Sequence, residues 1–166
     1  VLVCTIGEAP CQVIATGTPG DHVGSSVMIS SGSSSSCVVF GSVGSDSNGT
    51  DSGSASVLCE EDTNGTITWV NRGVQLVGEA AGDEFGFSVA ISSDSNFIAV
   101  GSRLNDPSDD KKDAGHVRVF QLEPSSLNYV KVGNDIDGER GERSDEDTGK
   151  YYVGDYSGYS IALSNK

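Results

Sequence analysis

The sequence predicts an all-β fold built from repeated four-stranded antiparallel sheets. Short runs of β-branched residues are separated by Gly, Ser, Asn and Asp, and no stretch carries apolar residues at helical spacing for three turns. Glycine supplies 22 of the 166 residues, while apolar residues make up only 36%. The third observation is an internal repeat, and its period is that of a whole supersecondary unit.

Three segments share the pattern Gly-Asp-x-x-Gly-x-Ser-(Val/Ile)-x-(Ile/Leu)-Ser, and they begin at Gly20, Gly82 and Gly154. A Gly-Glu pair recurs at Gly7, Gly78 and Gly138. The stretch from Gly-Asp to the next Gly-Glu has nearly the same length in both units (20 to 78 and 82 to 138). The stretch from Gly-Glu to Gly-Asp varies several-fold (7 to 20, 78 to 82 and 138 to 154). The core of the unit is therefore nearly constant, and one connecting loop absorbs the insertions, as in repeated blades with a variable rim.

These units divide the chain into four parts. We expect an N-terminal segment at 1–19, one blade at 20–77, a second at 78–137, and at 138–166 an acidic inter-blade loop with the first strand of a further blade. The chain would thus hold two complete blades plus part of a third. Expected strands of the second blade are 87–92, 97–101, 116–122 and 127–132. The stretch 97–100 is continuously apolar, as in a strand covered on both faces. Period-2 alternation turns Val117 and Val119 to one face and His116, Arg118 and Phe120 to the other.

Residues 85–90 read Phe-Gly-Phe-Ser-Val-Ala, and Gly41-Ser42 and Gly101-Ser102 follow the second strand of each unit. These motifs resemble the FG-GAP repeats of integrin α-subunit-like β-propellers, which open on Phe-Gly-x-Ser-Val-Ala and carry Gly-Ala-Pro later. The resemblance covers most of residues 20–164 and implies four-stranded antiparallel propeller blades. A closed propeller has about four to eight blades, so we expect the rest of a propeller, or copies of this chain, to complete the structure.

The resemblance also raises the question of calcium. The family often carries an Asp-rich calcium loop between the first two strands of a blade, but the corresponding connections here, 93–96 and 30–36, cannot supply the six or more oxygen ligands that calcium needs. Weak metal candidates remain in the loops between the second and third strands, namely Asp46, Asp51, Asp106, Asp109, Asp110 and Asp113. Turn formation is the alternative role for these aspartates, and we expect no firm cofactor, with calcium as the open alternative.

Cysteines and sequons indicate the environment. The four cysteines have no CxxC spacing, which fits disulfides better than zinc. Cys37 and Cys59 fall at neighbouring ends of an expected hairpin, so we expect them to pair, leaving Cys4 with Cys11. Asn48-Gly49-Thr50 and Asn64-Gly65-Thr66 are sequons, which predict N-glycans at Asn48 and Asn64. Together these features favour a secreted, extracellular protein.

Charge and motif content limit the function. The net charge of −14 disfavours nucleic acid and anionic membrane surfaces, and no apolar run reaches the length of a membrane-spanning helix. The Asp of each Gly-Asp pair is expected to bond backbone N–H groups in a turn. His22 and His116 occupy positions that vary between repeats, so we expect both to be exposed and non-catalytic.

Three functions follow as hypotheses. The first is an extracellular structural or adhesive glycoprotein, not an enzyme, whose blades are a rigid interaction scaffold and a candidate building block of a larger assembly or filament. The second is a glycan- or protein-binding module within a longer closed propeller, and the third is a carbohydrate-active enzyme. Partner specificity would reside in the variable loops at 8–19, 79–81 and 139–153.

Overall fold

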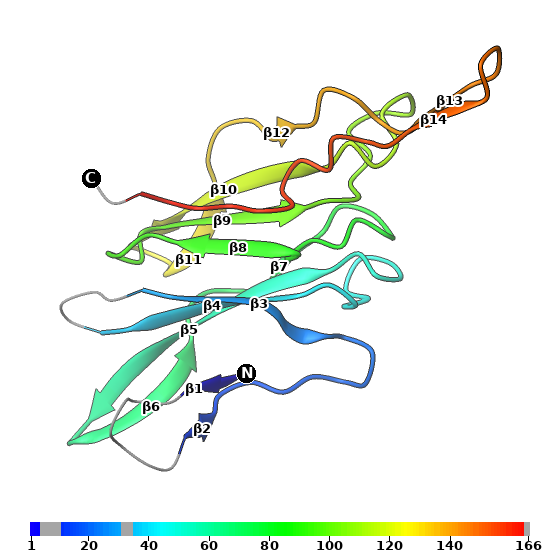
Figure 1. The fold of residues 1–166 in the computed structure, drawn as a ribbon. Helices are drawn as coiled ribbons and strands as arrows, with labels where there is room; N and C mark the ends of the chain where they lie inside the picture. Colours follow the sequence, from blue (N-terminus) through cyan, green and yellow to red (C-terminus); the bar gives the residue numbers. More distant parts are fainter. Residues whose placement is uncertain (4–10, 31–34, 165–166) are drawn as a thin grey trace.

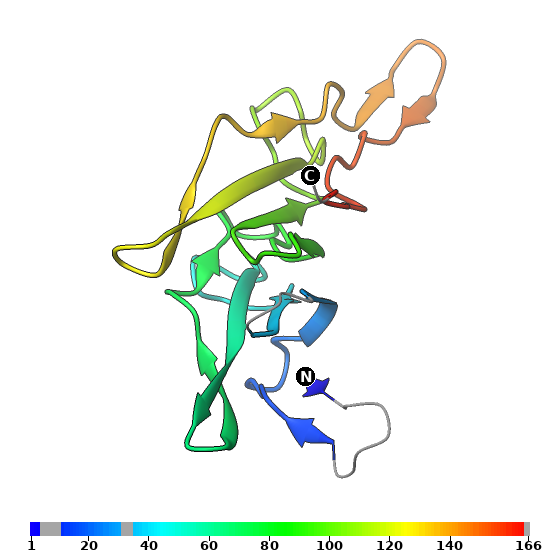
Figure 2. The same ribbon diagram turned by 90° about the vertical axis from the view of Figure 1, so that its left-hand side faces the viewer.

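A computed structural model describes residues 1–3, 11–30 and 35–164, and this part of the chain is all-β. Two twisted sheets stack face to face, each with four strand positions (Figure 1). A short N-terminal hairpin lies at one end of the stack, and a second hairpin projects from the other end (Figure 2). The expected architecture of two complete antiparallel blades is confirmed.

None of the described residues forms a helix long and apolar enough to cross a membrane.

The first blade, called blade 1, is an antiparallel meander. Its strands are β3 (Val23–Ile29), β4 (Cys37–Ser42), β5 (Ser54–Thr63), β6 (Thr66–Asn71) and β7 (Leu76–Val77). The order is β3-β4-β5-β6, and β7 continues along the same edge of β5 beyond β6. The fourth strand position is thus shared by two short segments. Strand β4 is buried along its whole length, because it lies between two strands and both of its faces are covered.

The second blade, called blade 2, repeats this plan. Its strands are β8 (Ser88–Ile91), β9 (Phe97–Ser102), β10 (His116–Glu123), β11 (Asn128–Lys131) and β12 (Ile136–Asp137), with β12 pairing with β10. These bounds agree with the expected strands to within one or two residues. The cross-strand register is also the same, since His116 faces Ser102 as Ser54 faces Ser42.

The remaining strands form two hairpins outside the blades. β1 (Leu2–Val3) pairs with β2 (Gln12–Val13), and β13 (Arg143–Asp145) pairs with β14 (Lys150–Tyr152) inside the acidic inter-blade loop. The expected first strand of a further blade is not formed in the described residues 159–164. In both complete blades the first strand pairs with the second strand of its own blade, and the part of the chain that the structure describes contains no such partner for residues 159–164.

The core lies between the two blades, and each blade has two distinct faces. The face of blade 1 that carries Cys37, Val39 and Val57 packs on the face of blade 2 that carries Ile98 and Phe120, in one buried cluster. We call the face of blade 1 that carries Cys37, Val39 and Val57, and the equivalent face of blade 2, the trailing face. The face of blade 2 that carries Ile98 and Phe120, and the equivalent face of blade 1, is the leading face. The leading face of blade 1 carries a second, smaller cluster of Val38, Phe40 and Leu58, on which the N-terminal residues Val1, Val3, Ile14 and Ala15 pack.

The repeated Gly-Asp turn fixes where each blade begins. Asp83 accepts hydrogen bonds from the backbone N–H groups of Glu79 (3.2 Å) and Ala80 (2.9 Å) through one carboxylate oxygen. Asp155 does the same for residues 139 and 140, and Asp21 for residue 18. The carboxylate therefore ties the inter-blade loop to the following strand, as the sequence predicts.

Candidate functional site: the blade junction and its open faces

A network of charged side chains lies on the leading face of blade 2, at the junction between the blades. Glu79, in the loop that enters blade 2, pairs with the Arg118 guanidinium of β10. Arg118 Nε also lies 3.3 Å from Asp135 Oδ2, and Lys131 Nζ lies 2.5 Å from Asp135 Oδ1. The His116 Nδ1 atom lies 3.9 Å from Glu79 Oε2. Because two carboxylates face two permanent cations, the network is balanced in charge.

The local environment shifts two pKa values in this network. Burial opposes ionisation of Asp135, but the hydrogen bond from Lys131 and the charge of Arg118 outweigh burial, so the pKa of Asp135 is lowered. Burial lowers the pKa of His116, although the carboxylates of Asp135, Asp83 and Asp137 act in the opposite direction. The imidazole is therefore held neutral at pH 7.

The expected exposure of His116 is wrong. Its relative exposure is 1%, and Ser54 at the equivalent position of blade 1 is fully buried as well. The two residues differ in type because their neighbours differ, not because the position faces solvent. His22 is exposed, as expected.

The same network contains the residues best placed to hold a metal ion. Among the described residues, Glu79, His116 and Asp135 form the group whose potential ligand atoms all lie within 4.8 Å of one another. Arg118 and Lys131 already neutralise the two carboxylates, however, so a divalent cation would add positive charge that no carboxylate of the group is left to compensate. We therefore assign to this group ion pairing that fixes the inter-blade loop to β10 of blade 2.

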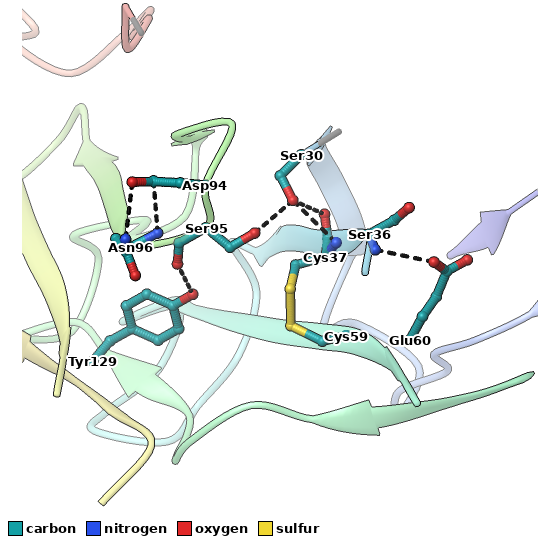
Figure 3. Close-up of a disulfide and its surroundings, with 9 residues drawn as sticks. All are labelled: Ser30, Ser36, Cys37, Cys59, Glu60, Asp94, Ser95, Asn96 and Tyr129. Carbon is teal, nitrogen blue, oxygen red and sulfur yellow. Dashed lines mark hydrogen bonds between the residues drawn. A yellow bond between two sulfur atoms is a disulfide. The ribbon is translucent and has the colours of Figure 1, made fainter. Parts of the chain in front are cut away.

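The Cys37–Cys59 disulfide, which the sequence predicts, is present and joins the central strands of blade 1 (Figure 3). The two residues lie directly opposite each other on β4 and β5, with Cα atoms 4.0 Å apart, and both are buried against blade 2. Cys11 is also disulfide-bonded, whereas its expected partner Cys4 lies outside the described residues.

Beside the disulfide, a contact between two serine hydroxyls links the blades, and a tyrosine hydroxyl of blade 2 holds one of these serines. Ser30 Oγ lies 2.7 Å from Ser95 Oγ, and the Tyr129 hydroxyl donates a 2.7 Å hydrogen bond to the Ser95 carbonyl (Figure 3). Burial raises the pKa of Tyr129 to about 12. The loops after β3 and β8 are thereby fixed to each other at the end of the junction opposite the charged network.

The six candidate metal aspartates lie in two equivalent turns and do not come together. Asp46 accepts a hydrogen bond from the N–H of Asp51 (2.9 Å), and Asp106 accepts one from the N–H of Asp113 (2.7 Å). Asp51 and Asp113 both have φ of 52°. Asp110 accepts from the Ser108 hydroxyl, and the carboxylate of Asp113 lies 3.4 Å from Lys112 Nζ. For Asp46, Asp51, Asp106 and Asp113 these contacts are those of loops that turn through the left-handed region.

The two sequons differ in their surroundings. Asn48 Nδ2 donates hydrogen bonds to the carbonyls of Gly78 (3.0 Å) and Glu79 (2.7 Å), which binds its loop to the inter-blade loop. In blade 2, Lys111 Nζ contacts the equivalent carbonyl of Gly138 at 3.4 Å. Asn64 instead lies at the exposed tip of the β5–β6 hairpin, with φ of 55°.

Both outer faces of the blade pair carry exposed apolar side chains at positions that the junction buries. On the leading face of blade 1, Val27 and Ile29 are 50% and 53% exposed, whereas Val89 and Ile91, their equivalents in blade 2, are 7% and 2% exposed. On the trailing face of blade 2, Phe97 is 37% exposed, whereas its equivalent Cys37 is 3% exposed. Both faces therefore have the chemistry of a blade interface.

Sequence reasoning missed the charged network, although one signal for it exists. Arg118 alternates with Val117 and Val119 on a strand whose other face is apolar, and it shares its face with Phe120. A charged residue at a core-facing strand position requires a buried partner. That partner, Glu79, belongs to the repeated Gly-Glu pair and lies far earlier in the chain, before the first strand of the same blade.

Residues 78–120 match the family model of the FG-GAP repeat. The matched stretch runs from the inter-blade loop through β8 and β9 into β10, so it includes Glu79, His116 and Arg118. This confirms the FG-GAP resemblance for the stretch that carries the motifs. A search of curated proteins found no match to the chain.

Proposed function

We propose that this chain is part of an extracellular structural or adhesive glycoprotein, in which the blades form a rigid scaffold that further blades extend. The trailing face of blade 2 is the surface through which the scaffold continues. On this proposal the chain serves as a structural scaffold that binds further blades, and it carries no catalytic site.

The supporting observation is the difference in exposure between equivalent positions. In blade 1, Val57 and Cys59 are 4% and 0% exposed under blade 2. The equivalent of Val57 in blade 2, Val119, is half-buried, and the equivalent of Cys59, Gln121, is exposed. Val130, which pairs with Gln121 on the neighbouring strand, is 50% exposed. Exposing apolar side chains of a sheet face to water is unfavourable, and stacking a further blade on the face would bury them.

The start of a third unit already lies against this face. Gly158 packs on the backbone of Gly101, Ser88 Oγ donates a 2.6 Å hydrogen bond to the Gly158 carbonyl, and Tyr159 contacts the ring of Phe87. The glycine packing and the serine hydrogen bond also join blades 1 and 2, at Gly41, Ser26 and Gly86. A continuing blade, from the same chain or from a neighbouring copy, would dock in the same way.

Support for the extracellular setting comes from the Cys37–Cys59 disulfide, the exposed sequon at Asn64 and the strongly acidic composition. FG-GAP repeats occur in propellers of the integrin type, which is consistent with an adhesive or structural role. The leading face of blade 1 is partly covered by N-terminal residues, whereas Phe97 and Val130 on the trailing face of blade 2 remain 37% and 50% exposed.

Sedimentation velocity on the protein and on the variants Phe97→Asp and Val130→Asp tests the proposal. If copies supply the covering blade, the wild type sediments as a concentration-dependent oligomer and both variants dissociate. If the same chain supplies it, the wild type remains monomeric and both variants lose unfolding free energy relative to Tyr151→Asp, a control on the projecting hairpin. Variants that match this control in both association and stability would refute the proposal.

A further inference from the structure

A groove of about 420 Å³ lies on the leading face of blade 1, and its volume is within the usual range for small-molecule sites. One wall is the N-terminal segment 14–17, and the floor is formed by strands β4, β5 and β6. The groove thus lies on the opposite side of the blade pair from the trailing face, so ligand binding there is independent of the proposed scaffold function. Its floor and far wall carry mainly hydroxyl, amide and indole groups, from Ser42, Ser45, Ser54, Ser56, Trp69 and Asn71.

The groove lacks the basic side chains that blade 2 carries at the equivalent positions. Ser54 and Ser56 are equivalent to His116 and Arg118, which contact the carboxylate of Glu79 in the blade junction. With serines at both positions, the groove has no cation to pair with an acidic side chain. The described residues that line it include one charged group, Asp21, and the whole chain carries a net charge of −14. An anionic ligand is therefore disfavoured, and a neutral polar one fits.

The indole of Trp69 gives the groove a flat apolar surface beside polar groups. Trp69 is half-buried, packs against the cluster of Val38, Phe40 and Leu58, and still lines the groove. The side chain of Gln75 donates a 2.9 Å hydrogen bond to Ser54 Oγ, which leaves the second N–H of its amide for another acceptor. Serine hydroxyls both donate and accept. This combination matches a sugar ring, which has an apolar C–H face and a rim of hydroxyl groups.

We propose that this groove binds a neutral oligosaccharide, with one sugar ring stacked on Trp69 and its hydroxyl groups bonded to Ser56, Asn71 and Gln75. The competing occupant is a polypeptide segment, such as a preceding blade. In blade 2 the equivalent position is filled by the acidic side chain of Glu79, from the loop that enters the same blade, and the serine-lined floor offers no partner for such a group.

Trp69 is the single tryptophan of the chain, so its fluorescence reports on the groove directly. The protein is titrated with cellohexaose, laminarihexaose, chitohexaose and mannohexaose, and the spectrum of Trp69→Phe is subtracted. We expect saturable change in emission with at least one of these sugars. Asn71→Ala and Gln75→Ala should each weaken binding about five-fold or more, the loss of one hydrogen bond to a ligand. Asn134→Ala, in the exposed loop between β11 and β12, should bind as the wild type does.

Two results would overturn the proposal. The first is no change in emission with any of the four sugars, or a change that is unaltered in both amide variants after circular dichroism has shown that they are folded. The second is a Trp69 emission in the native protein that acrylamide cannot quench, because this would show that a polypeptide segment already fills the groove.

Discussion

The hydroxyl of Ser26 donates a 2.7 Å hydrogen bond to the backbone carbonyl of Gly86, which joins the first strand of blade 1 to the start of blade 2. Ser88 repeats this bond with the carbonyl of Gly158 at 2.6 Å. The bond is possible because Gly41, on the neighbouring strand, brings the two backbones together; a Cβ at Gly41 would collide with the Gly86 carbonyl oxygen. The repeated serine and glycine are therefore the groups that set the spacing of the blades.

Replacing either serine should destabilise the stack. Ser26→Ala and Ser88→Ala each remove one partly buried hydrogen bond and leave a carbonyl without that donor, so we expect each to lower the unfolding free energy by about 1 kcal/mol. Urea denaturation followed by far-UV circular dichroism measures the change. Ser25→Ala, at an exposed neighbouring position, is the control and should lie within about 0.5 kcal/mol of the wild type. Equal effects in all three variants would contradict this assignment.

The Cys37–Cys59 bond should contribute substantially to stability. It closes a loop with a sequence separation of 22 residues, for which chain entropy alone gives about 3 kcal/mol. The double variant Cys37→Ala/Cys59→Ala should therefore unfold at a clearly lower urea concentration than the wild type. An unchanged midpoint would show that the contacts of β4 and β5 hold the blade without the cross-link.

Acidification should weaken the blade junction through His116. Because burial lowers its pKa in the folded state, the unfolded chain takes up a proton below about pH 6.5 that the folded protein does not. The unfolding free energy should thus fall as the pH drops from about 6.5 to 5, by up to about 1.4 kcal/mol per pH unit.

The matched pair His116→Ser and His22→Ser isolates this effect. His116→Ser copies the residue of blade 1 and should flatten the pH dependence in this window, whatever its effect on absolute stability. His22 is exposed, so His22→Ser should keep the slope of the wild type. A slope that survives in His116→Ser would assign the pH dependence to other groups.

The two sequons should differ in occupancy. An N-linked glycan replaces one of the two hydrogens on Asn48 Nδ2, and that atom donates two hydrogen bonds to backbone carbonyls. Asn64 lies at an exposed hairpin tip, where a glycan meets no such conflict. We therefore expect Asn64 to carry the glycan and Asn48 to be unmodified. Enzymatic deglycosylation in ¹⁸O-water followed by peptide mass spectrometry reads both sites, and a glycan on Asn48 would contradict the prediction.

The repeat made most of the fold predictable from the sequence. It located the strands of blade 2 within one or two residues and placed Cys37 opposite Cys59, because self-similarity reports a shared backbone. It did not reveal that the position of His116 is buried, because a residue exchanged between repeats can be exposed or can face a different neighbour. The pairing of Glu79 with Arg118 depends on how the inter-blade loop returns to β10 of the same blade, and no motif with a fixed sequence spacing indicates it.

The scaffold proposal requires that the trailing face of blade 2 is covered in the native protein. Hydroxyl-radical footprinting with mass spectrometry tests it at Phe97, which is 37% exposed here, against buried Phe120 at 7% and Tyr151 on the projecting hairpin at 61%. If further blades cover the face, Phe97 will be as unreactive as Phe120 while Tyr151 reacts freely. If Phe97 is oxidised well above Phe120, the face is open to solvent and the scaffold account is wrong.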